Sequence, residues 1–135
     1  MMGRRVDREG PVHQAIVDWL RMVMPDAMVY HCKNEINKKG KAKGWVQNNI
    51  ALEIAKAKKK GTIPGFPDLL VLPFANIGAF FLEVKAAGNY ASHVQKEVHA
   101  ELTRLGYHVA VVRSIDDVRK CLQDWGIGFR EKIKE

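Results

Sequence analysis

A short apolar segment that carries two opposite charges constrains this chain more than any other feature. Residues 79–86 read AFFLEVKA, so apolar side chains surround Glu83 and Lys85. Side chains alternate between the two faces of a strand, which puts these two charges on one face, about 7 Å apart along the chain. An ion in such surroundings costs several kcal/mol unless it finds a partner. The segment therefore predicts a buried strand with a functional charge cluster.

A second apolar segment lies upstream and also carries a carboxylate. Residues 65–72 read GFPDLLVL, in which Asp68 opens a continuous apolar run. Two carboxylates and a lysine are thus expected at the ends of two buried strands. Carboxylate oxygens are the ligands that Mg²⁺ and Mn²⁺ prefer, and a bound cation of this kind activates water. The pair of strands favours a divalent-metal site.

The periodicity of the chain is typical of one alternating α/β unit. Apolar residues at helical spacing predict four helices, at about residues 12–24, 46–58, 92–105 and 115–125. Short apolar runs predict four strands, at residues 28–32, 68–72, 79–85 and 107–113. The turn at residues 73–78 predicts an antiparallel hairpin, and the step from residue 80 to residue 113 predicts a right-handed parallel crossover.

Composition excludes several classes of protein. A length of 135 residues predicts one domain over residues 1–135, and 47% hydrophobic with 27% charged residues is typical of a soluble globular protein. Since no apolar run reaches about 18 residues, no membrane span is expected. The basic N-terminus leads into a charged segment, so we expect a cytoplasmic protein of a bacterium or a phage-infected cell. Cys32 and Cys121 have no metal-binding spacing and are expected to be reduced thiols.

The positive charge is concentrated in one segment. Residues 33–60 contain nine lysines and no arginine, against Glu35 and Glu53, and this segment accounts for the whole net charge of +7. Such a stripe indicates a polyanion binder, although a solvated lysine-rich loop explains the segment equally well. Lysine favours contact with phosphates over reading of bases. The candidate nucleic-acid contacts are Lys38, Lys39, Lys41, Lys43, Lys56, Lys58, Lys59 and Lys60.

An ordered set of motifs resembles a known nuclease family. GTIPGFPD at residues 61–68, FLEVKA at residues 81–86, Gln95 and VAVVRSIDD at residues 109–117 resemble the VRR-NUC branch of the PD-(D/E)XK nucleases, in its small stand-alone phage and bacterial form. The resemblance runs from about Glu9 to Gly126. It implies a restriction-endonuclease-like α/β core, with a mixed sheet of about four strands flanked by helices and a basic insertion at about residues 34–60. Ser114 follows Val112-Arg113 where the family has a second arginine, which leaves any role of that arginine open.

The resemblance also implies roles for the metal ligands. Asp68 and Glu83 would bind Mg²⁺ or Mn²⁺, with the main-chain carbonyl of Val84 as a further ligand. Glu9, just ahead of the first helix, matches an acidic position that supports the metal site. The alternatives are an ordinary strand-start aspartate for Asp68, a structural ion pair of Glu83 with Lys85, and a surface acid at a helix N-terminus for Glu9.

Two further side chains complete the expected catalytic set. Lys85 would hold or deprotonate the attacking water, and Gln95 would contact water or phosphate beside it. A purely structural place in its helix is the alternative for Gln95. His99, one turn later on the same helix, is interpreted as a flanking histidine with satisfied hydrogen bonds rather than as a catalyst.

The expected function is metal-dependent endonucleolytic hydrolysis of branched DNA. The resemblance implies a homodimeric Holliday-junction resolvase, and a two-fold dimer suits a junction that needs two matched cuts. Contact with phosphates would make binding salt-sensitive and largely independent of sequence. The alternatives are a repair- or restriction-type nuclease on flap or duplex DNA, and a non-catalytic nucleic-acid-binding module that keeps a nuclease fold.

Overall fold

The secondary structure follows the periodicity of the sequence closely. The computed structural model describes residues 7–32, 45–74 and 77–131, of which residues 45–50 are described by backbone alone. Its elements in chain order are α1 (Glu9–Val23), β1 (Met28–His31), α2 (Trp45–Lys59), β2 (Leu69–Leu72), β3 (Phe80–Val84), α3 (His93–Arg104), β4 (His108–Val112) and α4 (Ile115–Asp124). Every expected helix and strand is present, with ends that differ by at most three residues.

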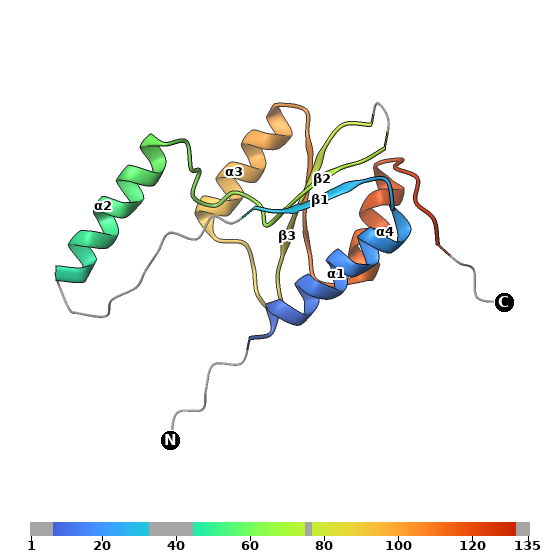
Figure 1. Ribbon diagram of the computed structural model, residues 1–135, viewed down its shortest axis with the longest axis horizontal. Coiled ribbons are helices and arrows are strands. Elements are labelled where there is room, and N and C mark those ends of the chain that lie inside the picture. The colour runs from blue at the N-terminus through green and yellow to red at the C-terminus, as the bar shows by residue number, and fades with distance from the viewer. Residues whose placement is uncertain (1–6, 33–44, 75–76, 132–135) are drawn as a thin grey trace, which may run out of the picture.

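One four-stranded mixed sheet organises the molecule. Figure 1 shows this sheet among the helices, and its strands lie in the order β1-β2-β3-β4. β1 pairs with β2 and β2 with β3 in antiparallel fashion, whereas β3 and β4 are parallel. The expected hairpin and the expected parallel connection through α3 are therefore confirmed, and so is the α/β fold class with a mixed sheet between helices.

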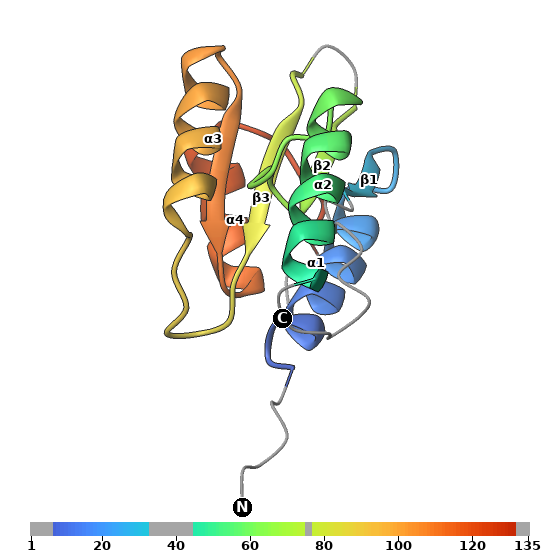
Figure 2. The same ribbon diagram turned by 90° about the vertical axis from the view of Figure 1, so that its left-hand side faces the viewer.

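The two faces of the sheet are covered differently. α1 and α4 pack against one face, and α3 covers β4 on the other (Figure 2). Alternate residues of β3, namely Phe80, Leu82 and Val84, belong to the core beneath α1 and α4. Phe81 points the opposite way and packs edge-on against Phe66 and Tyr107. Because β3 is buried on both faces, a polar side chain within it lies inside the protein.

The first helix begins earlier than its apolar stripe suggests. The Asp7 carboxylate accepts a hydrogen bond of 2.8 Å from the Gly10 N–H, which caps the helix start. Pro11 then occupies the first turn, where a missing N–H costs nothing. Glu9 is consequently the first residue of α1, and the expectation that it precedes the helix was wrong by one residue. It still stands at the helix end that favours a negative charge.

Part of one sheet face has no described helix over it. The strand register puts three large apolar residues on the same face as Phe81. They are Met28, Tyr30 and Leu72, and their exposed fractions are 69%, 61% and 44%. We call these three residues the open sheet face. α2 stands apart from the sheet (Figure 1) and has no packing contact with any other described helix or strand. An uncovered apolar surface of this kind is typical of an interaction site.

Two simpler expectations concern the membrane and the cysteines. Among the segments described, no helix combines the length and the apolar character that a membrane span needs. Cys32 and Cys121 are both free thiols, as their spacing predicted.

Candidate active site

Asp68 joins the ends of three strands. It immediately precedes β2, and its Oδ2 atom accepts a hydrogen bond of 2.8 Å from the Val84 N–H at the end of β3. Its main-chain carbonyl accepts a second bond, of 2.7 Å, from the Cys32 N–H just after β1. Leu69 pairs with Leu82 in the sheet, so one further step of the same register sets Asp68 opposite Glu83. The two carboxylates that the sequence singled out are therefore neighbours across the hairpin.

Glu83 is the buried charged residue of the described core, with 2% of its surface exposed. It points to the same face as Phe81, toward α3, because it lies two residues further along β3. Its Oε2 atom lies 3.9 Å from Lys85 Nζ, and its Oε1 atom lies 3.9 Å from His99 Nε2. Both distances suit ion pairing but exceed a hydrogen bond. Within the described residues, Glu83 Oε1 and His99 Nε2 are buried and have no hydrogen-bond partner.

The acidic cluster changes the protonation of Glu83. Burial, followed by a hydrogen bond to Asp68 and the charge of Asp68, raises the pKa of Glu83 to about 9. Glu9 acts in the same direction, and Lys85 opposes them. Two carboxylates in one dry site repel each other, so that one of them keeps a proton. Without a cation, the carboxyl group of Glu83 therefore keeps its proton at neutral pH.

An arginine and an asparagine connect Glu9 to the loop that follows β3. Asn89, in the loop after β3, donates from Nδ2 to Glu9 Oε1 over 3.4 Å. The main-chain carbonyl of Asn89 accepts hydrogen bonds from Arg113 Nη2 and Nε, at 2.7 and 3.2 Å. The single arginine of the Val112-Arg113 motif thus holds the loop that follows the charged strand. The sequence pointed to this arginine through the motif but gave it no role.

Gln95 uses part of its side chain in the fold. Its Oε1 atom accepts from the Ser92 N–H at 2.8 Å, and the Ser92 hydroxyl accepts from the Gln95 N–H at 3.2 Å. This reciprocal arrangement is a capping box at the start of α3. The side-chain NH₂ group is the part of Gln95 that could contact water or phosphate, and that role stays a prediction.

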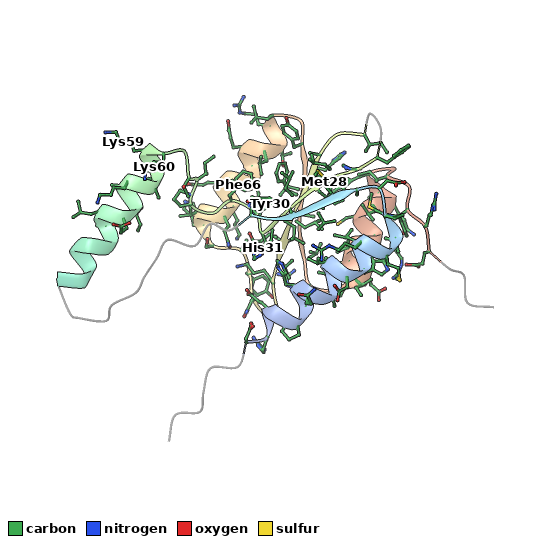
Figure 3. The ribbon with its side chains drawn as sticks, viewed as in Figure 1. Met28, Tyr30, His31, Lys59, Lys60 and Phe66 are labelled. Carbon is green, nitrogen blue, oxygen red and sulfur yellow. The ribbon has the colours of Figure 1, made fainter. Side chains whose placement is uncertain are left out.

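The candidate DNA-binding lysines fall into two groups. Lys56, Lys58, Lys59 and Lys60 lie on the last turn of α2 and just beyond it; Figure 3 labels Lys59 and Lys60 there. The members of the other group, Lys38, Lys39, Lys41 and Lys43, lie outside the described residues. Lys56 pairs with Glu53 at 3.9 Å on the exposed surface of α2, where such pairs contribute little.

Three histidines near the acids were not expected there. The rings of His13 on α1 and His31 on β1 lie 4.5 Å apart. Burial and His31 lower the pKa of His13, while the charge of Asp68 acts against them. Burial also lowers the pKa of His99, with Lys85 acting in the same direction. The sequence signal for His13 was its place four residues after Glu9, on the same helix face; nothing local indicated His31.

The donor chemistry of the site fits a divalent cation. Among the described residues, no three His, Cys, Asp or Glu side chains are placed to hold a metal ion between them. Asp68 and Glu83 supply two hard oxygen donors, and Glu83 has a buried oxygen without a partner. Mg²⁺ is commonly held by one or two carboxylates and keeps several waters. The chemistry of these two carboxylates therefore suits Mg²⁺ or Mn²⁺.

Comparison with known proteins supplies the family. The sequence model of the VRR-NUC domain matches residues 7–116. A solved structure described as a "VRR_NUC domain protein" is 23% identical, with a TM-score of 0.63 over 92% of this chain and 93% of that one. Another, described as "VRR_NUC domain", is 20% identical, with a TM-score of 0.56 over 87% and 97% of the two chains. At these identities the two structures show a common fold.

The family match carries the assignment. No curated protein matches the chain. The matched range nevertheless runs from Asp7, ahead of α1, through Asp116 in α4, and so includes the carboxylates, Lys85 and Arg113. A VRR-NUC domain is a nuclease-type domain, which implies nuclease activity and binding to DNA. The chain belongs to the VRR-NUC domain family.

Proposed function

We propose that this protein is a metal-dependent endonuclease that hydrolyses phosphodiester bonds in branched DNA. The observation that carries the proposal is the buried carboxyl group of Glu83 beside Asp68 and Lys85. A pair of acids in a dry site is unfavourable unless it keeps a proton or binds a cation. The presence of such a pair of acids in the core of a nuclease-type domain is best explained by cation binding.

Asp68 and Glu83 would hold the cation, and the Val84 carbonyl and Glu9 are further proposed ligands. When bound, a divalent cation lowers the pKa of water and polarises the scissile phosphate. Lys85, with 14% of its side chain exposed, would orient the attacking water and, as an ammonium ion, would stabilise negative charge on the phosphate. Asp68 is itself fixed by the Val84 N–H. Arg113 and Asn89 fix the loop that borders Glu9.

The lysines of α2 support a substrate recognised by its phosphate backbone. Lys56, Lys58, Lys59 and Lys60 follow one another at the end of a helix that has no packing contact with the other described elements. Ammonium groups contact phosphate as point charges and do not read bases. Specificity would therefore arise from the shape of the DNA, which favours branched over linear substrates.

We propose a homodimer as the active form. The open sheet face exposes Met28 and Tyr30 on β1 (Figure 3) next to Leu72 on β2. Apolar side chains in a row along an edge strand are poorly suited to solvent. A second copy of the chain would cover them by a two-fold contact and would bring a second set of acids to a junction that needs two cuts.

Cleavage of labelled DNA structures tests the catalytic proposal. We expect a four-way junction to be cut in Mg²⁺ or Mn²⁺ and to stay intact in EDTA. Lys85→Ala and Asp68→Asn should lower the cleavage rate by at least about 100-fold while the DNA is still bound. Lys96→Ala, on the exposed side of α3, is the matched lysine control and should cut like the wild type.

The same assay separates the alternative functions. Equal cutting of linear duplex or flap DNA in competition with a junction of the same length would favour a repair- or restriction-type nuclease. Binding without metal-dependent scission would favour a non-catalytic module. Full activity in both Lys85→Ala and Asp68→Asn would refute the assignment of the site.

Light scattering coupled to gel filtration tests the dimer. The wild type should run at twice its chain mass, and Tyr30→Glu should run as a monomer, since a buried unpaired charge is strongly unfavourable. Met22→Glu, an exposed methionine on α1, is the control and should remain dimeric. A monomeric wild type at micromolar concentration would contradict the proposal.

A further inference from the structure

Glu83, a proposed metal ligand, faces His99, which is not one, and the facing atoms of both side chains are buried without a hydrogen-bond partner among the described residues. The side chains of His99 and Glu83 are 13% and 3% exposed, and their facing atoms, Nε2 and Oε1, lie 3.9 Å apart. Within the described residues, neither atom has a hydrogen-bond partner. An unsatisfied buried polar group costs about 1–3 kcal/mol, so two that face each other call for an explanation.

The backbones on both sides of this contact are held firmly. α3 starts with the capping box of Ser92 and Gln95, and the Thr103 hydroxyl donates to the His99 carbonyl at 2.9 Å. β3 is paired on both edges, with β2 and β4. A shift of about 1 Å would bring the two atoms to the usual N–H···O distance.

The two oxygens of Glu83 meet different surroundings. Oε2 faces Lys85, on the side where the strand ends and the proposed cation and water would lie. Oε1 faces the imidazole of His99, which comes from another element. A carboxylate that binds an ion through one oxygen is commonly fixed by a hydrogen bond to the other.

We propose that His99 is a positioning residue for Glu83: its Nε2–H donates to Glu83 Oε1 and fixes the carboxylate so that Oε2 faces the metal. This inference rests on the proposed function, because it takes Glu83 to be a metal ligand. Lys85 could not serve instead, since its ammonium group lies at the other oxygen. The proposed hydrogen bond would satisfy both orphaned atoms at once.

Two variants and one control test the proposal through metal affinity. His99→Leu removes the donor and keeps an apolar side chain in place, whereas His99→Gln keeps an N–H donor at similar reach. His93→Gln, on the exposed first turn of the same helix, is the control. Titration calorimetry with Mn²⁺ should give a dissociation constant raised about tenfold in His99→Leu and nearly unchanged in His99→Gln and His93→Gln.

A second readout separates positioning from direct contact with the substrate. If His99 acts through Glu83, raising the Mn²⁺ concentration should restore most of the cleavage rate of His99→Leu. A rate that stays low at saturating metal would overturn the proposal, because it would place His99 at the reacting atoms. Urea unfolding in EDTA checks that the variants fold. If His99→Leu does not fold, His99→Met is used in its place.

The outcomes also separate this inference from the proposed function. A wild type that binds no Mn²⁺ would refute the metal site itself. A wild type that binds Mn²⁺ with the same affinity as His99→Leu would leave the metal site standing and refute the role of His99.

Discussion

At the scale of single residues, the chemistry of the site depends on the balance of charge around Glu83. Burial and Asp68 raise the pKa of this carboxyl group to about 9, against the pull of Lys85. Without a cation, the folded chain therefore binds a proton that the unfolded chain releases above a pH of about 4.5. The stabilisation tied to that proton is fully present below about pH 4.5 and is lost as the pH rises toward 9.

Glu83→Gln removes this dependence on pH. We expect the variant in EDTA to gain stability relative to the wild type between pH 6 and pH 8.5, by up to about 3 kcal/mol, since one proton corresponds to about 1.4 kcal/mol per pH unit. Urea unfolding at the two pH values measures the difference. Asp26→Asn, at an exposed carboxylate, is the control and should show no such trend. Parallel pH profiles of Glu83→Gln and the wild type would contradict the shifted pKa.

At the scale of elements, the loop before β2 fixes Asp68 against α3. Gly65 has a φ of +84°, and a Cβ atom there would come within 2.9 Å of Val94 Cγ1 and 3.0 Å of the Val94 main chain. The main chains of Gly65 and Val94 approach each other so closely that glycine is required at position 65. The GTIPGFPD motif thus has a packing role besides carrying the acid, because it ties the start of β2 to the first turn of α3.

Gly65→Ala should be distinctly more harmful than the same change at Gly61. Gly61 also has a positive φ, of +100°, but no atom lies within 4 Å of an added Cβ. We expect Gly61→Ala to lose about 1 kcal/mol of unfolding free energy from backbone strain alone, and Gly65→Ala to lose about 2–4 kcal/mol because it adds a clash with backbone. Thermal and urea unfolding measure both. Equal losses of unfolding free energy in the two variants would show that Val94 moves away from the added Cβ atom at no cost.

At the scale of the whole molecule, the described lysine cluster and the proposed catalytic acids come from different elements. The acids lie at the ends of β2 and β3, whereas the described lysine cluster lies at the end of α2, a helix that packs on no other described element. The lysines of α2 would attract DNA through its phosphates and leave the acids free to bind the cation.

Replacing Lys56, Lys58, Lys59 and Lys60 by glutamine should weaken DNA binding and make it less sensitive to salt. Each lost phosphate contact is expected to reduce the slope of log K against log salt by about 0.9 on duplex arms. Fluorescence anisotropy from 50 to 300 mM salt measures the slope. Lys120→Gln is the control. Lys120 is an exposed residue of α4, which packs on the sheet face that α3 does not cover, so this variant should leave the slope unchanged. An unaltered slope in the fourfold variant would exclude α2 from the DNA contact.

Much of the site could be read from the sequence because its signals are local. The alternation along residues 80–84 fixed which side chains of β3 share a face, and so predicted that Glu83 lies among apolar neighbours. The spacing of Ser92 and Gln95 is that of a capping box, although the sequence alone did not separate this role from a catalytic one. Helix and strand ends followed from prolines, glycines and caps within a few residues.

Other features required the three-dimensional arrangement. His99 was expected to be a satisfied flanking residue, yet the packing of α3 on the sheet brings its Nε2 atom to Glu83 Oε1. Arg113 reaches the Asn89 carbonyl across 24 residues of sequence, and His13 meets His31 only where α1 and β1 pack together. The sequence by itself determined which segments form helices and strands and which residues are charged or capping, because those properties depend on periods of two to four residues. The tertiary structure alone decided which of these groups face one another, because that depends on strand register and on how helices cross the sheet.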